Sequence, residues 1–171
     1  MGLSHAVITS VNRDDLNDGG SLFFAETIRE VKKFNNGCDV EVLIPDFKGD
    51  RIAINNIIEA SPEVINHNLE TVPRLQREIR TSASYGRSLS LLHYVKSQGF
   101  EGKTKTGLIV GMGESKEEVI AVLKDISKLD IDIVTIGQYL RPTAKHRPID
   151  SYAPKEEFEN YKLIGCLFYT S

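Results

Sequence analysis

The sequence predicts an α/β domain built on a parallel sheet, and three observations support this prediction. Short β-branched runs alternate with longer segments whose apolar residues recur every three or four positions, the pattern of strands alternating with amphipathic helices. Several strand candidates are apolar at consecutive positions, which is typical of strands covered on both faces. The long stretches between the strand candidates suit parallel pairing, because parallel strands need crossover connections that helices usually supply.

Each predicted element rests on its own apolar pattern. The strand candidates cover residues 5–11, 39–45, 63–67, 107–111 and 132–137. The helix candidates cover residues 21–33, 52–60 and 116–129, and residues 71–98 supply one or two more. Ser115 and Glu118 have the spacing of a capping box at the start of the helix at 116–129. Prolines at 142, 148 and 154 indicate an extended tail from residue 141 to about residue 159.

The length leaves two architectures open. A complete eight-stranded barrel takes about 250 residues, and this chain has 171. We therefore expect either an open sheet or an incomplete barrel, each with two exposed edge strands. In both, ligands bind at the carboxyl ends of the strands.

Composition excludes several classes of protein. The formal net charge is −3, so no basic face points to nucleic acid. No apolar run reaches the roughly 18 to 20 residues that cross a bilayer, so no membrane partner is expected. Cys38 and Cys166 lie far apart and form no C-x-x-C pair. This pattern argues against a disulfide scaffold and against a zinc or iron–sulfur motif in this chain, and it suits a reducing compartment.

Polar residues follow all five strand candidates and suit a ligand that carries an amine, a carboxylate and hydroxyls. Each group also has a simpler interpretation. Asp14, Asp15 and Asp18 suit turns and the cap of the next helix. Asn12 and Arg13 suit either a ligand or an exposed turn.

Three further patterns leave alternatives open. Gly111-x-Gly113 suits either backbone contact with a ligand or a tight turn, and it is not a dinucleotide fingerprint. His67 and Glu70 have no third histidine or cysteine nearby, so hydrogen-bonding roles are favoured over metal binding. Lys105 is expected to precede the fourth strand, which argues against a Schiff-base role. A short basic run, which suits either a carboxylate ligand or a solvated loop, consists of Arg141, Lys145, His146 and Arg147.

Longer strings are more specific, and together they resemble lipoyl synthase, a family of radical S-adenosylmethionine enzymes. The strings are VITSVNRDDL at 7–16 with DGG at 18–20, IPDF at 44–47, NHNLETV at 66–72, GLIVGMGE at 107–114 and VTIGQYLRPT at 134–143. His146, Pro148, Tyr152, Pro154 and Phe158 continue the pattern. The resemblance covers about residues 2–165.

The resemblance implies a partial (β/α) TIM-type barrel of parallel strands, with about five of its six βα units at residues 1–140 and a truncated, extended tail at 141–171. It implies sulfur insertion at C6 and C8 of a protein-bound octanoyl chain. The cofactors are S-adenosylmethionine and two [4Fe–4S] clusters. Implied partners are an octanoylated lipoyl-carrier domain or H protein and an electron donor such as ferredoxin or flavodoxin. The implied compartment is the cytoplasm, or the mitochondrion or plastid of a eukaryote.

The resemblance also implies site residues. Those that bind S-adenosylmethionine are Thr9, Ser10, Asn12, Arg13, Asp14, Asn68, Glu70, Gly111, Gly113, Glu114, Gln138 and Tyr139. Arg141 is implied to meet the substrate or the loop of the second cluster.

The chain also departs from the family pattern. The cysteine triplets that hold the two clusters and the C-terminal Arg-Ser-Ser-Tyr stretch have no counterpart in it, so we assign it no metal ligand or catalytic residue. We expect this chain to be inactive alone. The alternative is a non-catalytic α/β protein that binds a small polar ligand or a carrier protein.

Overall fold

A computed structural model describes residues 2–81 and 83–170 of the chain. The strands are β1 (His5–Thr9), β2 (Asp39–Leu43), β3 (Val64–Asn66), β4 (Lys103–Val110) and β5 (Ile133–Gln138). The helices are α1 (Ser21–Phe34), α2 (Arg51–Glu59), α3 (Gln76–Ile79), α4 (Tyr85–Ser97), α5 (Lys116–Ser127) and α6 (Lys155–Thr170). Two 3₁₀ turns, η1 (Phe47–Gly49) and η2 (Pro73–Leu75), follow β2 and precede α3.

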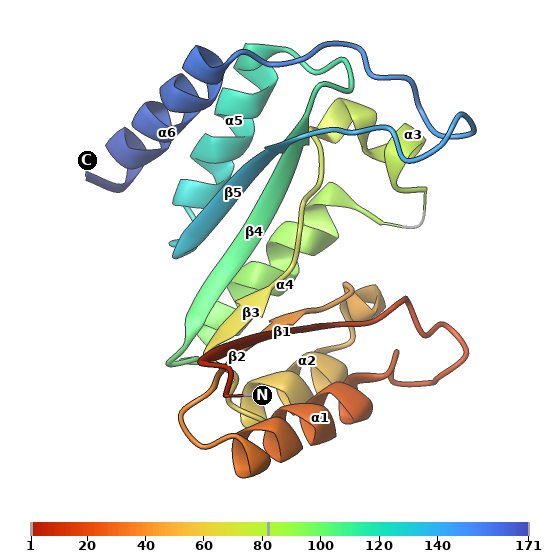
Figure 1. Cartoon of the computed structure of the whole chain (residues 1–171), viewed down its shortest axis with the longest axis vertical. Coiled ribbons are helices and arrows are strands. Elements are labelled where there is room, and N and C mark those ends of the chain that lie inside the picture. Colours follow the sequence, from red (N-terminus) through yellow and green to blue (C-terminus); the bar gives the residue numbers. More distant parts are fainter. Residues whose placement is uncertain (1, 82, 171) are drawn as a thin grey trace.

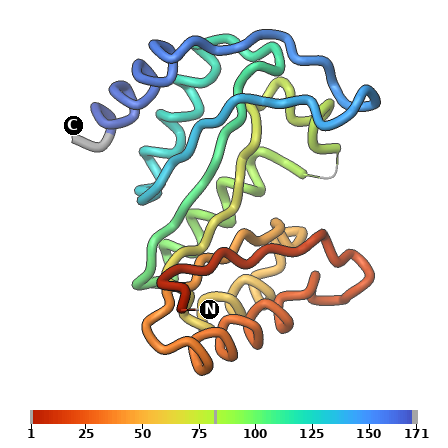
Figure 2. The backbone as a smooth tube through the Cα atoms, in the orientation of Figure 1, coloured from red at the N-terminus to blue at the C-terminus, as the bar shows by residue number. Residues whose placement is uncertain are grey.

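The five strands form one parallel sheet in the order β1-β2-β3-β4-β5. Sequence order and spatial order coincide, so each helical crossover moves the chain one strand along the sheet. The sheet does not close, and β1 and β5 are its edges. The helices cover the outer face of the curved sheet, and the inner face lies open (Figures 1 and 2).

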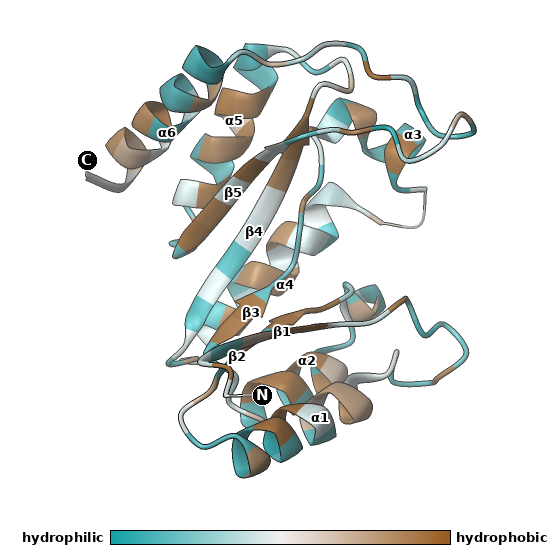
Figure 3. Cartoon of the chain, viewed as in Figure 1, coloured by the Kyte–Doolittle hydropathy of each residue, from teal (hydrophilic) through white to brown (hydrophobic). Residues whose placement is uncertain are grey.

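The core lies between the sheet and its helices. Val40 and Val42 of β2 point outward and are completely buried, as are Ile28 of α1 and Ile57 of α2. Figure 3 shows apolar residues along β5 and on α2 and α5. In the part of the chain that the structure describes, helices cover only the outer face of the sheet, so the expectation of strands covered on both faces, drawn from the consecutive apolar residues, is wrong.

The buried carboxylate of Glu41 on β2 has partners on three other strands, β1, β3 and β4, on the inner face of the sheet. Lys105 of β4 donates from Nζ to Oε1 of Glu41 on β2 over 2.8 Å, and His5 of β1 places Nε2 3.5 Å from Oε2. Asn66 of β3 donates to the same carboxylate over 3.3 Å. Lys105 thus reaches across β3 to Glu41 on the concave face of the curved sheet (Figure 1).

The fourth strand is longer than the sequence indicated. We expected it to begin at residue 107, with Lys105 before it, but β4 begins at Lys103. The alternating lysines and threonines concealed this start, because Thr104 and Thr106 are completely buried on the helix side. Their hydroxyls are satisfied locally: Thr104 bonds to Asp132, and Thr106 donates to a backbone carbonyl of the neighbouring chain segment.

The tail differs from the expectation of an extended segment. Residues 141–154 contain no helix or strand, but Lys155–Thr170 forms α6, so the expectation is wrong from Lys155 onward. Pro154 precedes the first helical residue, where a proline is compatible with helix initiation. Tyr161 is only 2% exposed and donates to Glu157 of the same helix over 2.6 Å, and Glu157 pairs with Lys116 of α5 over 2.9 Å, which joins the two helices.

Other local predictions are confirmed. Residues 71–98 contain α3 and α4, and Ser115 and Glu118 form the capping box of α5. In the described part of the chain, no helix is both long and apolar enough to span a bilayer.

Two isoleucines of α2 provide a test of the packing. Ile57 is completely buried, whereas Ile52 of the same helix is 74% exposed. Replacing Ile57 with alanine should lower the free energy of unfolding by about 2 to 5 kcal/mol, because it leaves a cavity in the core. Ile52→Ala should change it by less than about 0.5 kcal/mol. Urea denaturation of both variants measures the difference, and equal effects would contradict this packing.

Candidate functional site

The carboxyl ends of all five strands lie along one rim of the open sheet, as Figure 1 shows. Most of the residues predicted from the sequence to bind a ligand lie in the segments that follow these ends. The centre of the rim carries Asn68 and Glu70, which follow β3. The segments after β1 and β5 lie at its two ends.

Asn68 lies across β4 on the concave face. A Cβ atom added at Gly107 would lie 2.8 Å from Oδ1 of Asn68 and 3.1 Å from the hydroxyl of Thr135, so glycine leaves the room that Asn68 occupies. Among the described residues, no hydrogen bond satisfies the side-chain amide of Asn68. This amide is free to bind a ligand.

Glu70 has a strained backbone and follows β3 at the same rim. Its φ is +65°, in the left-handed region that non-glycine residues rarely adopt. Pairing with β4 holds this conformation, because Glu70 N donates to Gly107 O over 2.9 Å and Ile109 N donates to Glu70 O over 2.7 Å. Its carboxylate has no ion-pair or hydrogen-bond partner in the described ranges. Such strain is concentrated at functional sites.

The loop after β1 uses most of its charged groups internally. Arg13 forms a two-pronged ion pair with Asp15, with distances of 2.8 and 2.6 Å, which lowers the pKa of that carboxyl. Asp14 lies 2.9 Å from Nζ of Lys48. Asp18 caps α1 by accepting from two backbone N–H groups, and this lowers its pKa, as the interpretation as turn and cap predicts.

Thr9, Ser10 and Asn12 are exposed at the same end of the rim. Ser10 donates its hydroxyl to the carbonyl of Val11 over 2.9 Å. Asn12 lines a polar cavity of about 250 Å³ with Asp46 and Arg80. Their roles as ligand-binding residues, like those of Arg13 and Asp14, stay predictions.

Sequence reasoning missed Arg80. Its guanidinium donates to the backbone carbonyl of Asn68 over 2.9 Å, so it lies beside the segment that carries the free amide of that residue. Arg80 lines the cavity of about 250 Å³ and supplies a positive charge at the rim. Its position after α3, away from any strand end, gave no signal in the sequence.

The loop after β4 is held by its own glutamate. The carboxylate of Glu114 accepts from Gly111 N and from Met112 N, the latter over 2.9 Å. Gly111 and Gly113 both have φ +100°, and a Cβ at Gly111 would lie 2.5 Å from the carbonyl of Ser151. Gly111 is therefore required by the approach of the tail, and Glu114 shapes the loop.

The residues after β5 also hold the tail. Gln138 donates to the carbonyl of Ser151 over 3.1 Å and accepts from Ala153 N over 2.9 Å. Tyr139 donates its hydroxyl to the carbonyl of Arg147 over 2.9 Å. Arg141 donates to the carbonyls of His146 and Ala144. These contacts give all three residues structural partners, and their cofactor or substrate roles stay predictions.

His67 has the hydrogen-bonding role that the sequence favoured. It is 1% exposed, and its ring nitrogens lie 2.9 Å from the carbonyl of Ile44 and 2.8 Å from the hydroxyl of Ser88. Burial lowers its pKa from 6.5 to about 4. Among the described residues, no group of three or more histidine, cysteine or acidic side chains is placed to hold a metal ion.

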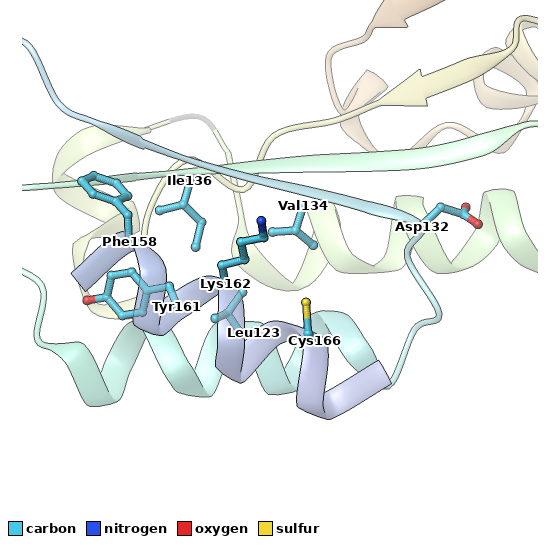
Figure 4. A pocket seen from close by; sticks show the side chains of 9 residues that line it. Leu123, Asp132, Val134, Ile136, Phe158, Tyr161, Lys162 and Cys166 are labelled. Carbon is cyan, nitrogen blue, oxygen red and sulfur yellow. The ribbon is translucent and has the colours of Figure 1, made fainter. Parts of the chain in front are cut away.

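A larger cavity lies away from the rim. It measures about 570 Å³ and is bounded by β5, α5 and α6 on the outer side of the sheet. Figure 4 shows Val134, Ile136 and Phe158 among the side chains that line it. Its apolar lining does not suit the polar ligand for which the rim is equipped.

Comparison with known proteins now identifies the family. The profile of the radical SAM superfamily matches residues 1–126, more than half of the chain. The chain belongs to the radical SAM superfamily. The chain is 53% identical over 165 residues to the lipoyl synthase of Rubrobacter xylanophilus and 51% identical to the mitochondrial lipoyl synthase of Nematostella vectensis. These alignments cover 96% of this chain and 51% and 56% of those proteins, so it spans about half the length of the curated relatives it matches. The resemblance to lipoyl synthase is confirmed.

Solved structures confirm the fold. Methylornithine synthase (PylB) matches 98% of this chain and 49% of its own with a TM-score of 0.77 and 19% sequence identity. SuiB of Streptococcus suis, solved with bound S-adenosylmethionine, matches 97% of this chain and 36% of its own with a TM-score of 0.68 and 13% identity. The predicted α/β architecture with an incomplete parallel barrel is therefore correct.

The low pKa of His67 predicts a pH dependence of stability in this radical SAM fold. The unfolded histidine takes up a proton near pH 6.5, whereas the folded one resists protonation down to about pH 4. As the pH falls from 6.5 to 4, each unit of decrease should lower the free energy of unfolding by about 1.4 kcal/mol, because the unfolded chain binds more protons.

Denaturation of the wild type and of His67→Gln between pH 7 and pH 4 measures this effect. The variant should lose stability less steeply over that range. His93 is exposed on α4, so His93→Gln should keep the wild-type slope. Parallel curves for the wild type and His67→Gln would show that His67 is not the titrating group.

Proposed function

We propose that this chain is the cofactor- and substrate-binding part of a lipoyl synthase, whose reaction inserts sulfur at C6 and C8 of an octanoyl chain carried on a protein. The similarity to lipoyl synthases over 96% of the chain carries this proposal. The free polar groups at the rim support it, because they lie where parallel α/β folds bind ligands.

The described residues fit S-adenosylmethionine. Asn68 offers a free amide and Glu70 a free carboxylate, which suit the hydroxyls of a ribose and an ammonium group. Arg80, beside Asn68, suits the methionyl carboxylate. When bound, S-adenosylmethionine supplies the radical chemistry of this superfamily. The chain's own contribution is to orient the cofactor and to keep its reactive end against the substrate.

The rigid rim suits this positioning role. Glu70 is fixed by pairing with β4, and Asn68 fills the space left by Gly107. The backbones of both residues are therefore held before a ligand arrives, which lowers the entropy lost on binding. The ion pair between Glu41 and Lys105 places further polar groups on the same concave face.

The described residues do not fit an iron–sulfur cluster. Cys38 is buried before β2, and Cys166 is exposed on α6, so the two thiols lie on different elements. A cluster of this superfamily needs three thiolates. We therefore assign no step of the reaction through a cluster to the residues of this chain, and we expect the chain alone not to catalyse sulfur insertion.

The count of cysteines favours a second candidate function. A chain with two separated thiols and an intact ligand rim suits a non-catalytic protein that binds a small polar ligand or a carrier protein. Under either candidate the chain, supplied with iron and sulfide, should gain no [4Fe–4S] absorbance band, and a band would contradict our assignment of no cluster ligands to its two cysteines. For either function we propose a reducing compartment, the cytoplasm or the mitochondrion or plastid of a eukaryote.

Titration calorimetry with S-adenosylmethionine tests the proposal on this chain. The double variant Asn68→Ala/Glu70→Gln should weaken binding at least tenfold, because each lost hydrogen bond to a charged or buried group costs about 1.5 to 3 kcal/mol. Asn36 and Glu101 are exposed far from the rim, so Asn36→Ala/Glu101→Gln should bind as the wild type does. Equal affinities for all three proteins would contradict the site.

A further inference from the structure

The segment between β5 and α6 combines unpaired positive charge with exposed apolar side chains. We call residues 139–154 the tail loop. Its Arg141 and Lys145, and Arg77 of α3, have no carboxylate partner among the described residues. The chain as a whole carries a net charge of −3, so this local excess of cations is not a consequence of composition.

Two large apolar side chains accompany these charges. Leu140 is 67% exposed and Tyr152 is 69% exposed. They lie on neighbouring segments, because Gln138 is hydrogen-bonded to the carbonyl of Ser151 and to the N–H of Ala153. Exposed tyrosine and arginine next to apolar surface are typical of protein–protein interfaces, where such residues supply most of the binding energy.

The tail loop is ordered although it is exposed. Arg141 bonds to the carbonyl of His146 over 2.9 Å, and the hydroxyl of Thr143 lies 2.9 Å from Nδ1 of the same residue. Arg147 is joined to Glu78 of α3 over 2.6 Å, which fixes the loop beside α3, as Figure 1 shows. A fixed surface loses little entropy when a partner docks.

The loop also borders the candidate site. Asp150 N donates to Gly111 O over 2.9 Å, so the loop runs beside the carboxyl end of β4. An acyl chain attached to a folded domain reaches the rim only if that domain's own surface lies against the edge of the site. The tail loop forms such an edge, and its positive charge selects a negatively charged surface.

We propose that the tail loop, together with Arg77 of α3, docks the acidic surface of the protein domain that presents the octanoyl-lysine. This inference rests on the proposed function and adds the surface at which the carrier binds. Leu140 and Tyr152 provide apolar contact, and Lys145 and Arg77 provide charge complementarity and steer the encounter.

The test is a titration of the isotope-labelled 171-residue chain with an octanoylated lipoyl domain of net negative charge, followed by NMR. In the wild type, the signals of the tail loop should shift, and raising the salt from 50 to 300 mM should weaken binding. Lys145→Glu/Arg77→Glu should weaken binding about tenfold or more, because like charges face each other across the interface. Neither residue makes an ion pair that the fold needs.

A matched double variant controls for the change in net charge. Lys33 and Lys124 are exposed on α1 and α5, and Lys33→Glu/Lys124→Glu should change the affinity less than about twofold. Tyr152→Ser should also weaken binding without changing its salt dependence. A free octanoyl-lysine peptide should bind both double variants equally, since it lacks the acidic surface.

The outcomes separate this inference from the proposed function. Equal affinities of the carrier for both double variants, or shifts confined to elements other than the tail loop, would overturn the docking surface. So would a result in which an acidic flavodoxin shifts the tail loop and the octanoylated domain does not. S-adenosylmethionine binding by the same samples is an independent readout: its loss would reject the proposed cofactor site, whereas carrier docking is judged from the charge variants alone.

Discussion

Parallel pairing of all five strands is the constraint on which the rest of the structure depends. Each connection must return the chain to the edge of the sheet at which the strands begin. The helices in these connections cover the outer face with residues such as Ile28 and Ile57. The inner face then carries polar groups such as Glu41 and Lys105 beside apolar ones such as Val7. Every strand also ends at the same rim, so short segments that are distant in the sequence become neighbours there. The site is a consequence of the strand direction before any side chain is considered.

The concave face shows how a charge is kept inside such a sheet. Burying the carboxylate of Glu41 is costly unless other groups compensate it, and three strands each contribute one: His5, Asn66 and Lys105. Removing Lys105 would leave a buried, uncompensated charge, which costs more than the pair itself contributes. This cluster therefore favours the curvature that brings β1, β2 and β4 within reach of one another.

The sequence correctly predicted the features that arise from local periodicity. It did not predict features that depend on contacts with residues distant in the sequence. The apolar runs located all five strands, and Ser115 marked the start of α5. The start of β4 was hidden because Thr104 is buried through a bond with Asp132, a partner distant in sequence. The sequence also could not distinguish Glu114, whose carboxylate accepts from its own loop, from Glu70, whose carboxylate has no partner among the described residues, because both are glutamates that follow a strand. Arg80 was missed because its place beside Asn68 is created only by the fold.

The rim therefore contains two kinds of polar side chain, and their division bears on function. Glu114, Gln138 and Arg141 spend their hydrogen bonds on backbone groups and so fix the loops around the site. Asn68 and Glu70 have backbones fixed by the sheet, but their side chains have no partners within the part of the chain that the structure describes. A free polar group on a rigid backbone is poorly satisfied until a ligand arrives, and a ligand that satisfies both groups gains their hydrogen bonds at little cost in chain entropy. The surrounding loops satisfy their own hydrogen bonds, so the centre of the rim is where we propose that a polar cofactor binds.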